Sequence, residues 1–375
     1  MRKRSQLVVD LNILGENYSK VKDLAPNSDV LFMVKADAYG HGLVPVSSYA
    51  HKELGIKDFG CASVGEAMAL RSQLKDEKFE IYVFSDTQLE LTEFSQYYVN
   101  HRVKPVLKTL QDLDFFLNCD DFKFFPICLK FNTGMNRLGI DSDKREQVID
   151  LLKKHGRSEV HHLMTHFACA SQSMNKNKRN IKAREEFNIL KEDFRNAGIS
   201  VEHTSIANSG AIEQKVGLDE SHIRPGLMMY GPSSLNPGLE QLSHYNGRLI
   251  SRLETYVINT FEVEQGQPIG YGATPVPHAG VVAVIALGYG DGFPTRFRGA
   301  KLRFQEEIGF VSGRVNMDMS SVLFDKNSKI KGGDKFTVWD QDTEFYKQLC
   351  THAQSIPYEI FCQITPRVPR IYSLK

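Results

Sequence analysis

The sequence contains no long hydrophobic run, no closely paired cysteines and almost no net charge, and each absence removes a class of function. No segment approaches the roughly 20 consecutive apolar residues of a membrane-spanning helix, so no membrane partner is expected. A net charge of +1 over 375 residues gives no electrostatic reason to expect nucleic acid as a partner. The six cysteines are scattered without zinc-like spacing, which predicts no metal site and favours reduced thiols in a cytoplasm.

The first two-thirds of the chain alternate short apolar runs with helix-like segments. Eight runs are candidate strands, at residues 29–36, 58–63, 80–85, 103–107, 125–132, 160–167, 203–209 and 223–231. Amphipathic stretches such as 63–74 and 183–198 lie between them. Eight strand-then-helix units in about 230 residues match the size of a (β/α)8 barrel. A doubly wound open sheet also alternates in this way, but no G-x-G-x-x-G follows the first strand.

The pattern becomes β-rich after residue 240, with glycine-containing turns and few helical periods. We therefore expect an α/β protein with an N-terminal (β/α)8 TIM-type barrel at residues 1–240 and a C-terminal mostly-β domain at residues 241–375. The segment "QLVVDLNIL" at 6–14 is predicted to be a strand that precedes the barrel, and it is a candidate to pair with the β domain.

Chemistry-bearing residues recur where the candidate barrel strands end, which is where barrel enzymes place their active sites. These residues are Lys35, Tyr39, Arg137, His166, Asn208, Ser209, Arg224 and Gly226. Arginine offers forked donors to carboxylate or phosphate, and backbone N–H groups near glycine can approach phosphate oxygens. The combination therefore favours an anionic, phosphate-bearing ligand joined to a lysine.

Lys35 ends an apolar run in "VLFMVKADAYGHG". Burial disfavours a charged ammonium group, so it lowers the pKa of a lysine from about 10.4 and makes the amine a nucleophile. The best-fitting use is a covalent bond to the aldehyde of pyridoxal phosphate. A lysine whose stem packs while its head reaches solvent is an equally weighted reading of this position alone.

Nine motifs, in order, resemble those of the alanine racemase family over residues 5 to 372. They are "VKADAYGHG", "KFNTGMNRLGI", "THFA", "ANSGA", "IRPGLMMYG", "IGYGAT", "LGYGDG", "NMDM" and "RVPRIY". The resemblance implies a pyridoxal-phosphate-dependent racemase that interconverts L- and D-alanine and supplies D-alanine for peptidoglycan. It also implies a head-to-tail homodimer with shared active sites.

By this resemblance Lys35 holds the cofactor and serves as one catalytic base. Racemisation exchanges a proton on both faces of the α-carbon, so a second base is required, and the family places it at Tyr271, donated by the other subunit. Arg224 matches the arginine at the pyridine nitrogen, and His166 is expected to orient Arg224 or Tyr271. Without the resemblance, Tyr271 reads as an aromatic in a turn and His166 as a core histidine.

Further roles follow from the same resemblance. Tyr39, Ser209 and the backbone at Gly226 and Leu227 are assigned to the phosphate, and Asn208 completes the cofactor-binding set. Arg137 matches the residue at the phenol oxygen and the substrate carboxylate, while Tyr289 and Met317 close the pocket from the partner subunit. Lys130 matches a position that is often a carbamylated lysine, although an ordinary strand lysine paired with a carboxylate fits it almost as well.

The sequence departs from the family at several positions. Pro366 stands where many members have a tyrosine that touches the phosphate, and Asn316 replaces a small or thiol side chain. Both changes keep open a broader-specificity racemase of serine, lysine or arginine. Ser205 stands where many members have a histidine behind Arg224, and His203 is the nearby candidate substitute.

Two other functions share parts of this pattern. A decarboxylase on the same architecture uses the same cofactor and lysine, but "GYGAT" and "NMDM" fit the racemase better. A non-catalytic carrier of pyridoxal phosphate resembles the barrel alone and lacks the β domain.

Overall fold

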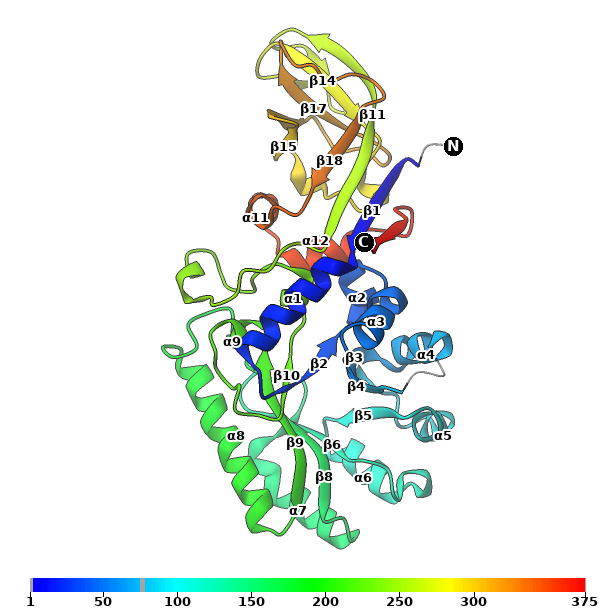
Figure 1. Ribbon diagram of the computed structural model, residues 1–375, viewed down its shortest axis with the longest axis vertical. Helices are drawn as coiled ribbons and strands as arrows, with labels where there is room; N and C mark the ends of the chain where they lie inside the picture. Colours follow the sequence, from blue (N-terminus) through cyan, green and yellow to red (C-terminus); the bar gives the residue numbers. More distant parts are fainter. Residues whose placement is uncertain (1–2, 75–77, 375) are drawn as a thin grey trace.

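The computed structural model describes residues 3–74 and 78–374, and it contains two stacked bodies, a barrel and a β domain above it (Figure 1). Eight parallel strands form the barrel: β2 (Asp29–Met33), β3 (Asp58–Ser63), β4 (Glu80–Asp86), β5 (Val103–Leu107), β6 (Cys128–Asn132), β8 (Glu159–Met164), β9 (Ser200–Asn208) and β10 (His222–Arg224). The pairing of β5 with β6 closes the ring, because Val106 and Leu107 lie beside Cys128 and Leu129. The predicted barrel is therefore confirmed.

Helices surround this ring. They are α1 (Leu11–Leu24), α2 (Lys35–Gly40), α3 (Leu43–Lys52), α4 (Val64–Gln73), α5 (Thr92–His101), α6 (Leu110–Asn118), α7 (Arg145–Lys154), α8 (Lys178–Asn196), α9 (Ser209–Glu213) and α10 (Leu227–Tyr230). Among the described residues, no helix combines the length and apolar character that crossing a bilayer requires.

The observed strands correct three predictions. The run 29–36 pairs only as far as Met33, so Lys35 follows the strand instead of ending it. The run 223–231 is strand only to Arg224, because Pro225 cannot donate a ladder hydrogen bond and the apolar residues after Gly226 form α10. In the predicted strand 6–14, helix α1 begins at Leu11 because the Asp10 carboxylate accepts the N–H groups of Asn12 and Ile13.

The second body is the mostly-β domain that the sequence predicts. Its main sheet contains β1 (Ser5–Asp10), β11 (Ser251–Val263), β14 (Gly280–Ile285), β15 (Lys301–Phe304), β16 (Glu307–Ser312), β17 (Ser320–Asp325), β18 (Lys335–Trp339) and β19 (Arg370–Ser373). Strand β1 lies between β11, its antiparallel neighbour, and β19, its parallel neighbour. A residue range from the start of the chain thus contributes an interior strand, next to the edge strand β19, to a sheet whose other strands come from the last third of the chain.

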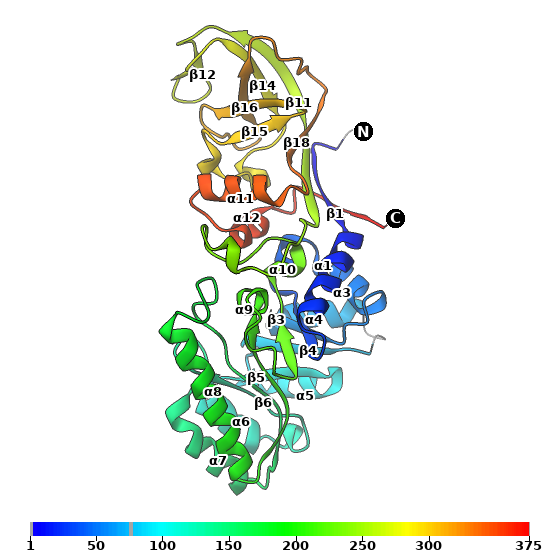
Figure 2. The same cartoon turned by 60° about the vertical axis from the view of Figure 1, so that its left-hand side comes forward.

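Two helices of the β domain, α11 (Thr343–His352) and α12 (Pro357–Gln363), lie between its sheet and the barrel (Figure 2). Helix α12 packs against α2, and the ring of Phe361 lies edge-on to His41 at 4.7 Å. Tyr230 stacks on His41 from the barrel side. This shared aromatic core holds the segment after β2 between the two bodies.

Candidate functional site

The residues after β2 form one turn of left-handed helix. Four successive non-glycine residues, Ala36 to Tyr39, have φ between 52° and 54°. Each costs about 1–2 kcal/mol in this conformation, so the segment forms only because surrounding contacts hold it. Since side chains four residues apart share a helix face, the turn directs both Lys35 and Tyr39 into one cavity.

Specific hydrogen bonds stabilise this left-handed turn. The Glu66 carboxylate on α4 accepts the N–H of Ala36 and the N–H of Ala62, each at 2.7 Å. The Asp37 side chain accepts the N–H of Leu43 at 2.7 Å, which joins the turn to α3. Gly40 then passes so near α12 that an added Cβ would lie 2.4 Å from the carbonyl oxygen of Phe361. The turn is therefore fixed from the barrel and from the β domain.

A cavity of about 510 Å³ opens at the C-terminal ends of the barrel strands. Ten predicted site residues line it: Lys35, Tyr39, Lys130, Arg137, His166, Asn208, Ser209, Arg224, Gly226 and Leu227. Its volume suits a small cofactor together with an amino acid. Active sites of barrel enzymes lie at strand ends, and this rule correctly predicted that residues far apart in the chain line one cavity.

Several basic groups lie close together in the cavity, and their pKa values are lowered. Burial and the neighbouring Arg137 lower the pKa of Lys35 from its ordinary 10.5, while Glu66 partly opposes this. Burial, together with four neighbouring cations, lowers the pKa of Lys130 to about 8. Burial, together with Arg224, Lys130 and other nearby cations, lowers the pKa of His166 well below 6.5. The share of neutral amine therefore rises at both lysines, and the His166 imidazole is neutral at neutral pH.

Arg224 is 4% exposed and, among the described residues, its side chain donates to neutral acceptors. Its Nη1 donates to Ser205 Oγ, and its Nη2 donates to the Thr165 carbonyl and, at 3.3 Å, to His166 Nδ1. Burial lowers the pKa of Arg224 to about 10, which leaves it protonated at neutral pH. The structure thus answers which residue supports Arg224: it is Ser205.

His203 has a different set of neighbours. Its Nε2 lies 3.2 Å from Glu202, and its ring lies edge-on to His161 and His222. The histidine that reaches Ser205 is His162, whose Nε2 lies 2.8 Å from Ser205 Oγ. Sequence reasoning missed this residue because it sits inside an apolar strand pattern, where a histidine reads as core.

At the other end of the cavity, Ser209 Oγ accepts the N–H of Gly226 at 3.0 Å. A Cβ on Gly226 would lie 2.3 Å from the Tyr39 hydroxyl, so a larger residue here would displace that hydroxyl. Tyr358 of α12 also lines this region, with its ring 5.8 Å from that of Tyr39. Tyr358 was not predicted, because nothing in "PYEI" distinguishes it from a packing residue.

Three predicted residues do not line the cavity of their own chain. Tyr271 lies in the turn between β12 (Pro268–Ile269) and β13 (Thr274–Pro275) and is 71% exposed. Tyr289 and Met317 lie beside each other on the β domain, where the N–H of Gly290 donates to the Met317 carbonyl, and both are about half exposed. Figure 1 shows this domain at the opposite end of the molecule from the lower part of the barrel.

The two substituted positions that bear on substrate size also lie outside this cavity lining. Pro366 lines a neighbouring hollow together with Ala36, Asp37 and Cys362. Asn316 belongs to the β domain, where its carbonyl accepts the N–H of Tyr289 at 2.9 Å and its side-chain oxygen is buried without a partner.

A closed (β/α)8 barrel with a lysine-bearing cavity at its C-terminal rim, joined to a mostly-β domain, defines a class of two-domain barrel enzymes. Two family models match this chain: alanine racemase, N-terminal domain, over residues 9–234, and alanine racemase, C-terminal domain, over residues 250–372. The chain therefore belongs to the alanine racemase family.

Individual relatives agree with this assignment. The alanine racemase of Nitrosococcus oceani is 31% identical over 370 residues, which cover 97% of this chain and 98% of the relative. That of Shewanella woodyi is 31% identical over 369 residues, covering 96% of each. Among solved structures, the biosynthetic alanine racemase of Pseudomonas aeruginosa is 26% identical, with a TM-score of 0.85 and full coverage of both chains.

Proposed function

We propose that this protein is a cytoplasmic, pyridoxal-phosphate-dependent racemase that interconverts L- and D-alanine and supplies D-alanine for peptidoglycan. The observation that carries the proposal is the cavity in which Lys35, Arg137 and Arg224 meet the hydroxyls of Tyr39 and Ser209. Family membership supports the substrate, because the relatives named above are alanine racemases.

The residues present suit the cofactor. Lys35 offers a partly neutral amine for its aldehyde, and the hydroxyls of Tyr39 and Ser209 with the backbone at Gly226 and Leu227 offer donors for its phosphate. Arg224 is a buried cation whose protein acceptors are neutral. Its N–H groups that have no protein acceptor can donate to the ring nitrogen of the cofactor. When bound, pyridoxal phosphate supplies an electron sink that acidifies the α-proton of the amino acid.

Side chains of the protein move the proton and hold the reacting groups in place. Lys35 takes or returns the α-proton on one face, and its lowered pKa raises the share of neutral amine at neutral pH. Arg224 Nη1 donates to one protein acceptor and Nη2 to two, so Nε–H and the second N–H of Nη1 are the donors assigned to the ring nitrogen. A guanidinium does not release its proton, so Arg224 would leave the ring nitrogen of a bound cofactor unprotonated and would limit its strength as an electron sink. Arg137 binds the substrate carboxylate.

A second base must act on the opposite face, and we assign it to Tyr271 of the partner subunit. The exposure of Tyr271 in its own chain supports this assignment, because a side chain 71% exposed on a protruding hairpin is available to a second molecule. Tyr289 and Met317 are exposed on the same domain and are assigned to the same partner surface. The proposed enzyme is therefore a homodimer with shared sites.

The test of the reaction uses purified protein with added pyridoxal phosphate in heavy water. L-alanine, L-serine, L-lysine and L-arginine are supplied separately, and optical rotation and α-deuterium are followed together. We expect fast inversion of alanine with one deuterium per inversion. Comparable rates on lysine or arginine would replace the proposal with a broader-specificity racemase, and carbon dioxide release would indicate a decarboxylase.

The shared site is tested with hybrid dimers of a Lys35→Ala subunit and a Tyr271→Phe subunit. If Tyr271 serves the partner, one of the two sites in each hybrid holds both native bases, so the hybrid should show about half the activity of the native dimer. Each parent variant alone is the control and should be inactive. An inactive hybrid would contradict the shared site.

A further inference from the structure

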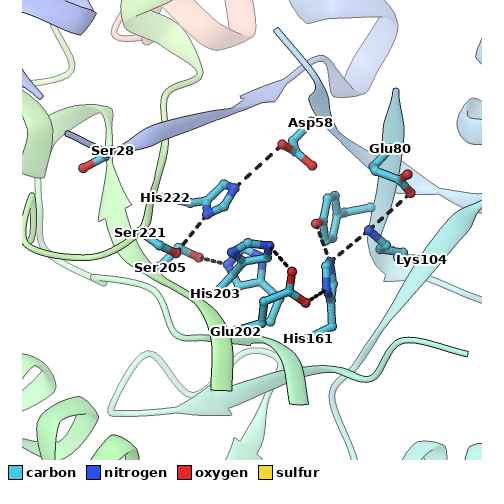
Figure 3. A network of polar contacts seen from close by, with 12 residues as sticks. Ser28, Asp58, Glu80, Lys104, His161, Glu202, His203, Ser205, Ser221 and His222 are labelled. Atoms are coloured by element: carbon cyan, nitrogen blue, oxygen red, sulfur yellow. Dashed lines mark hydrogen bonds and ion pairs between the residues drawn. The ribbon is translucent and has the colours of Figure 1, made fainter. Parts of the chain in front are cut away.

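The N-terminal floor of the barrel, opposite the rim that bears Lys35, contains a network of polar side chains (Figure 3). Four histidines meet there: His161 and His162 on β8, His203 on β9 and His222 on β10. Asp58, Glu80, Lys104 and Glu202 surround them. Such a cluster in a barrel interior requires a physical explanation, because each buried polar group must find a partner.

One part of the network resembles a metal site but has a better explanation. Atoms of His161, Glu202 and His203 lie within 4.8 Å of one another. Lys104, however, lies with Nζ 2.9 Å from His161 Nε2, and an ammonium group can only donate. His161 Nε2 is therefore the acceptor, and Nδ1 carries the proton that is donated to Glu202 at 2.6 Å. Since Nδ1 is the atom facing Glu202, these side chains form a completed hydrogen-bond chain.

The other part of the network leads from the floor to the active site. His162 Nε2 lies 2.8 Å from Ser205 Oγ, and Ser205 Oγ accepts Nη1 of Arg224. His162 and Ser205 are both fully buried, and Arg224 is 4% exposed and lines the Lys35 cavity. This chain of three residues is the connection from the histidine cluster to the site.

The charge of Arg224 determines how protons are arranged along this chain. A hydroxyl has one proton, and its oxygen faces the guanidinium, so the proton points away from Arg224. It then has an acceptor in His162 Nε2, which places the imidazole proton on Nδ1, a buried atom with no hydrogen-bond partner among the described residues. Burial, together with the neighbouring His222 and Arg224, holds the pKa of His162 well below 6.5, so the ring is neutral and able to accept. Hydrogen bonds aligned in one direction strengthen one another.

We propose that His162 is a positioning residue that acts through Ser205: by accepting the Ser205 hydroxyl proton, it turns the oxygen toward Arg224 and holds the guanidinium in place for the cofactor ring. The proposal rests on the proposed function for the role of Arg224. It also explains how a serine serves at a position where a longer side chain is common. The Ser205 side chain is short, and its hydrogen bond with His162 connects it to the histidine cluster at the N-terminal end of the barrel.

The experiment is a double-mutant cycle on the dissociation constant of pyridoxal phosphate, measured by fluorescence quenching of the full-length protein. Ser205→Ala should weaken binding about tenfold, because Arg224 loses a buried acceptor. His162→Leu should weaken it about threefold and should shift the visible absorption of the bound cofactor. The double variant should match Ser205→Ala, because His162 then has no hydroxyl to orient.

Two further variants separate positioning from folding. His162→Gln retains a side-chain oxygen as acceptor and should recover most of the affinity lost in His162→Leu. His203→Leu is the matched control, since it removes a neighbouring histidine of the cluster that does not contact Ser205, and it should leave binding unchanged. Additive losses in the cycle, or equal losses in His203→Leu, would overturn the proposal.

A measurement without cofactor separates failure of this proposal from failure of the proposed function. In cofactor-free protein labelled with ¹⁵N-histidine, His162 should be the neutral, Nδ1-protonated tautomer at pH 7, and Ser205→Ala should change its Nε2 shift. The resonances of His162 are assigned as those that are missing from the spectrum of His162→Gln. An Nε2-protonated ring would refute the proposal. Native protein that binds no pyridoxal phosphate would instead refute the proposed function, and the tautomer would still decide the arrangement.

Discussion

Lys130 is predicted to carry a carbamate when carbon dioxide is present. It is 7% exposed, and the charged groups that act on it are the cations Arg224, Arg137, Lys35 and Lys108. The fall of its pKa from 10.5 to about 8 means that the folded protein disfavours the ammonium form by about 3 kcal/mol. Loss of one proton gives the neutral amine, and addition of carbon dioxide then forms an N–C bond and releases a second proton, so that the cation is replaced by an anion.

The same shift sets the expected extent of reaction. At pH 7.5 about a quarter of Lys130 is neutral amine, whereas an ordinary lysine with a pKa of 10.5 is about 0.1% neutral. Lys130 should therefore react at least a hundredfold faster than a surface lysine. Because its pKa is lowered, the neutral share grows as pH rises through about 8 and shrinks below it.

The assay is ¹³C NMR of the protein in ¹³C-bicarbonate. We expect one carbamate resonance at pH 7.5, weaker at pH 6.5 because less amine is neutral, and absent in Lys130→Arg, which retains the charge but cannot be modified in this way. Absence of the resonance up to pH 8.5, or its persistence in Lys130→Arg, would refute the reasoning.

Three further predictions concern the cavity and the left-handed turn. Tyr358→Phe should weaken pyridoxal phosphate severalfold while leaving unphosphorylated pyridoxal unchanged, because its hydroxyl lies at the Tyr39 end of the cavity; equal losses for both ligands, measured by fluorescence titration, would contradict this placement. In Glu66→Gln the loss of a negative charge should lower the pKa of Lys35 further, so that the reaction of cofactor-free protein with pyridoxal phosphate begins at lower pH; an unchanged pH profile of the absorbance change would count against it. Gly40→Ala should destabilise the protein by about 2 kcal/mol or more, since φ is +78° and its Cβ would meet the Phe361 carbonyl at 2.4 Å; thermal unfolding against Gly55→Ala, a position with positive φ and open space, separates the contact from the strain.

Much of the barrel could be predicted from the sequence, because strand periodicity and the position of the active site follow rules that apply to barrel enzymes in general. The alternation of apolar runs predicted all eight strands, and the residues after them proved to line one cavity. Patterns fail where distant contacts override local preference. Nothing local favours left-handed geometry at Ala36–Tyr39; Glu66 and the β domain impose it.

The site residues that were missed come from parts of the chain with no sequence signal. His162 reads as a core position within a strand, and only the register that brings β8 beside β9 reveals its contact with Ser205. Tyr358 reaches the cavity from α12, more than 300 residues after Lys35. Tyr271, by contrast, was identified only by resemblance, because its place in a single chain is an exposed hairpin.

The position of β1 between β11 and β19 has a consequence for biosynthesis. Strand β1 leaves the ribosome before the barrel strands, but its antiparallel partner, which begins at Ser251, follows about 240 residues later. At about 5–20 residues per second, β1 waits roughly 12 to 50 seconds for its neighbour. The barrel strands are all made during that interval, so the barrel can close while this strand remains an unpaired edge. A nascent chain is therefore exposed to wrong pairing at this strand, and a chaperone that covers "QLVVD" would protect it until the β domain is complete.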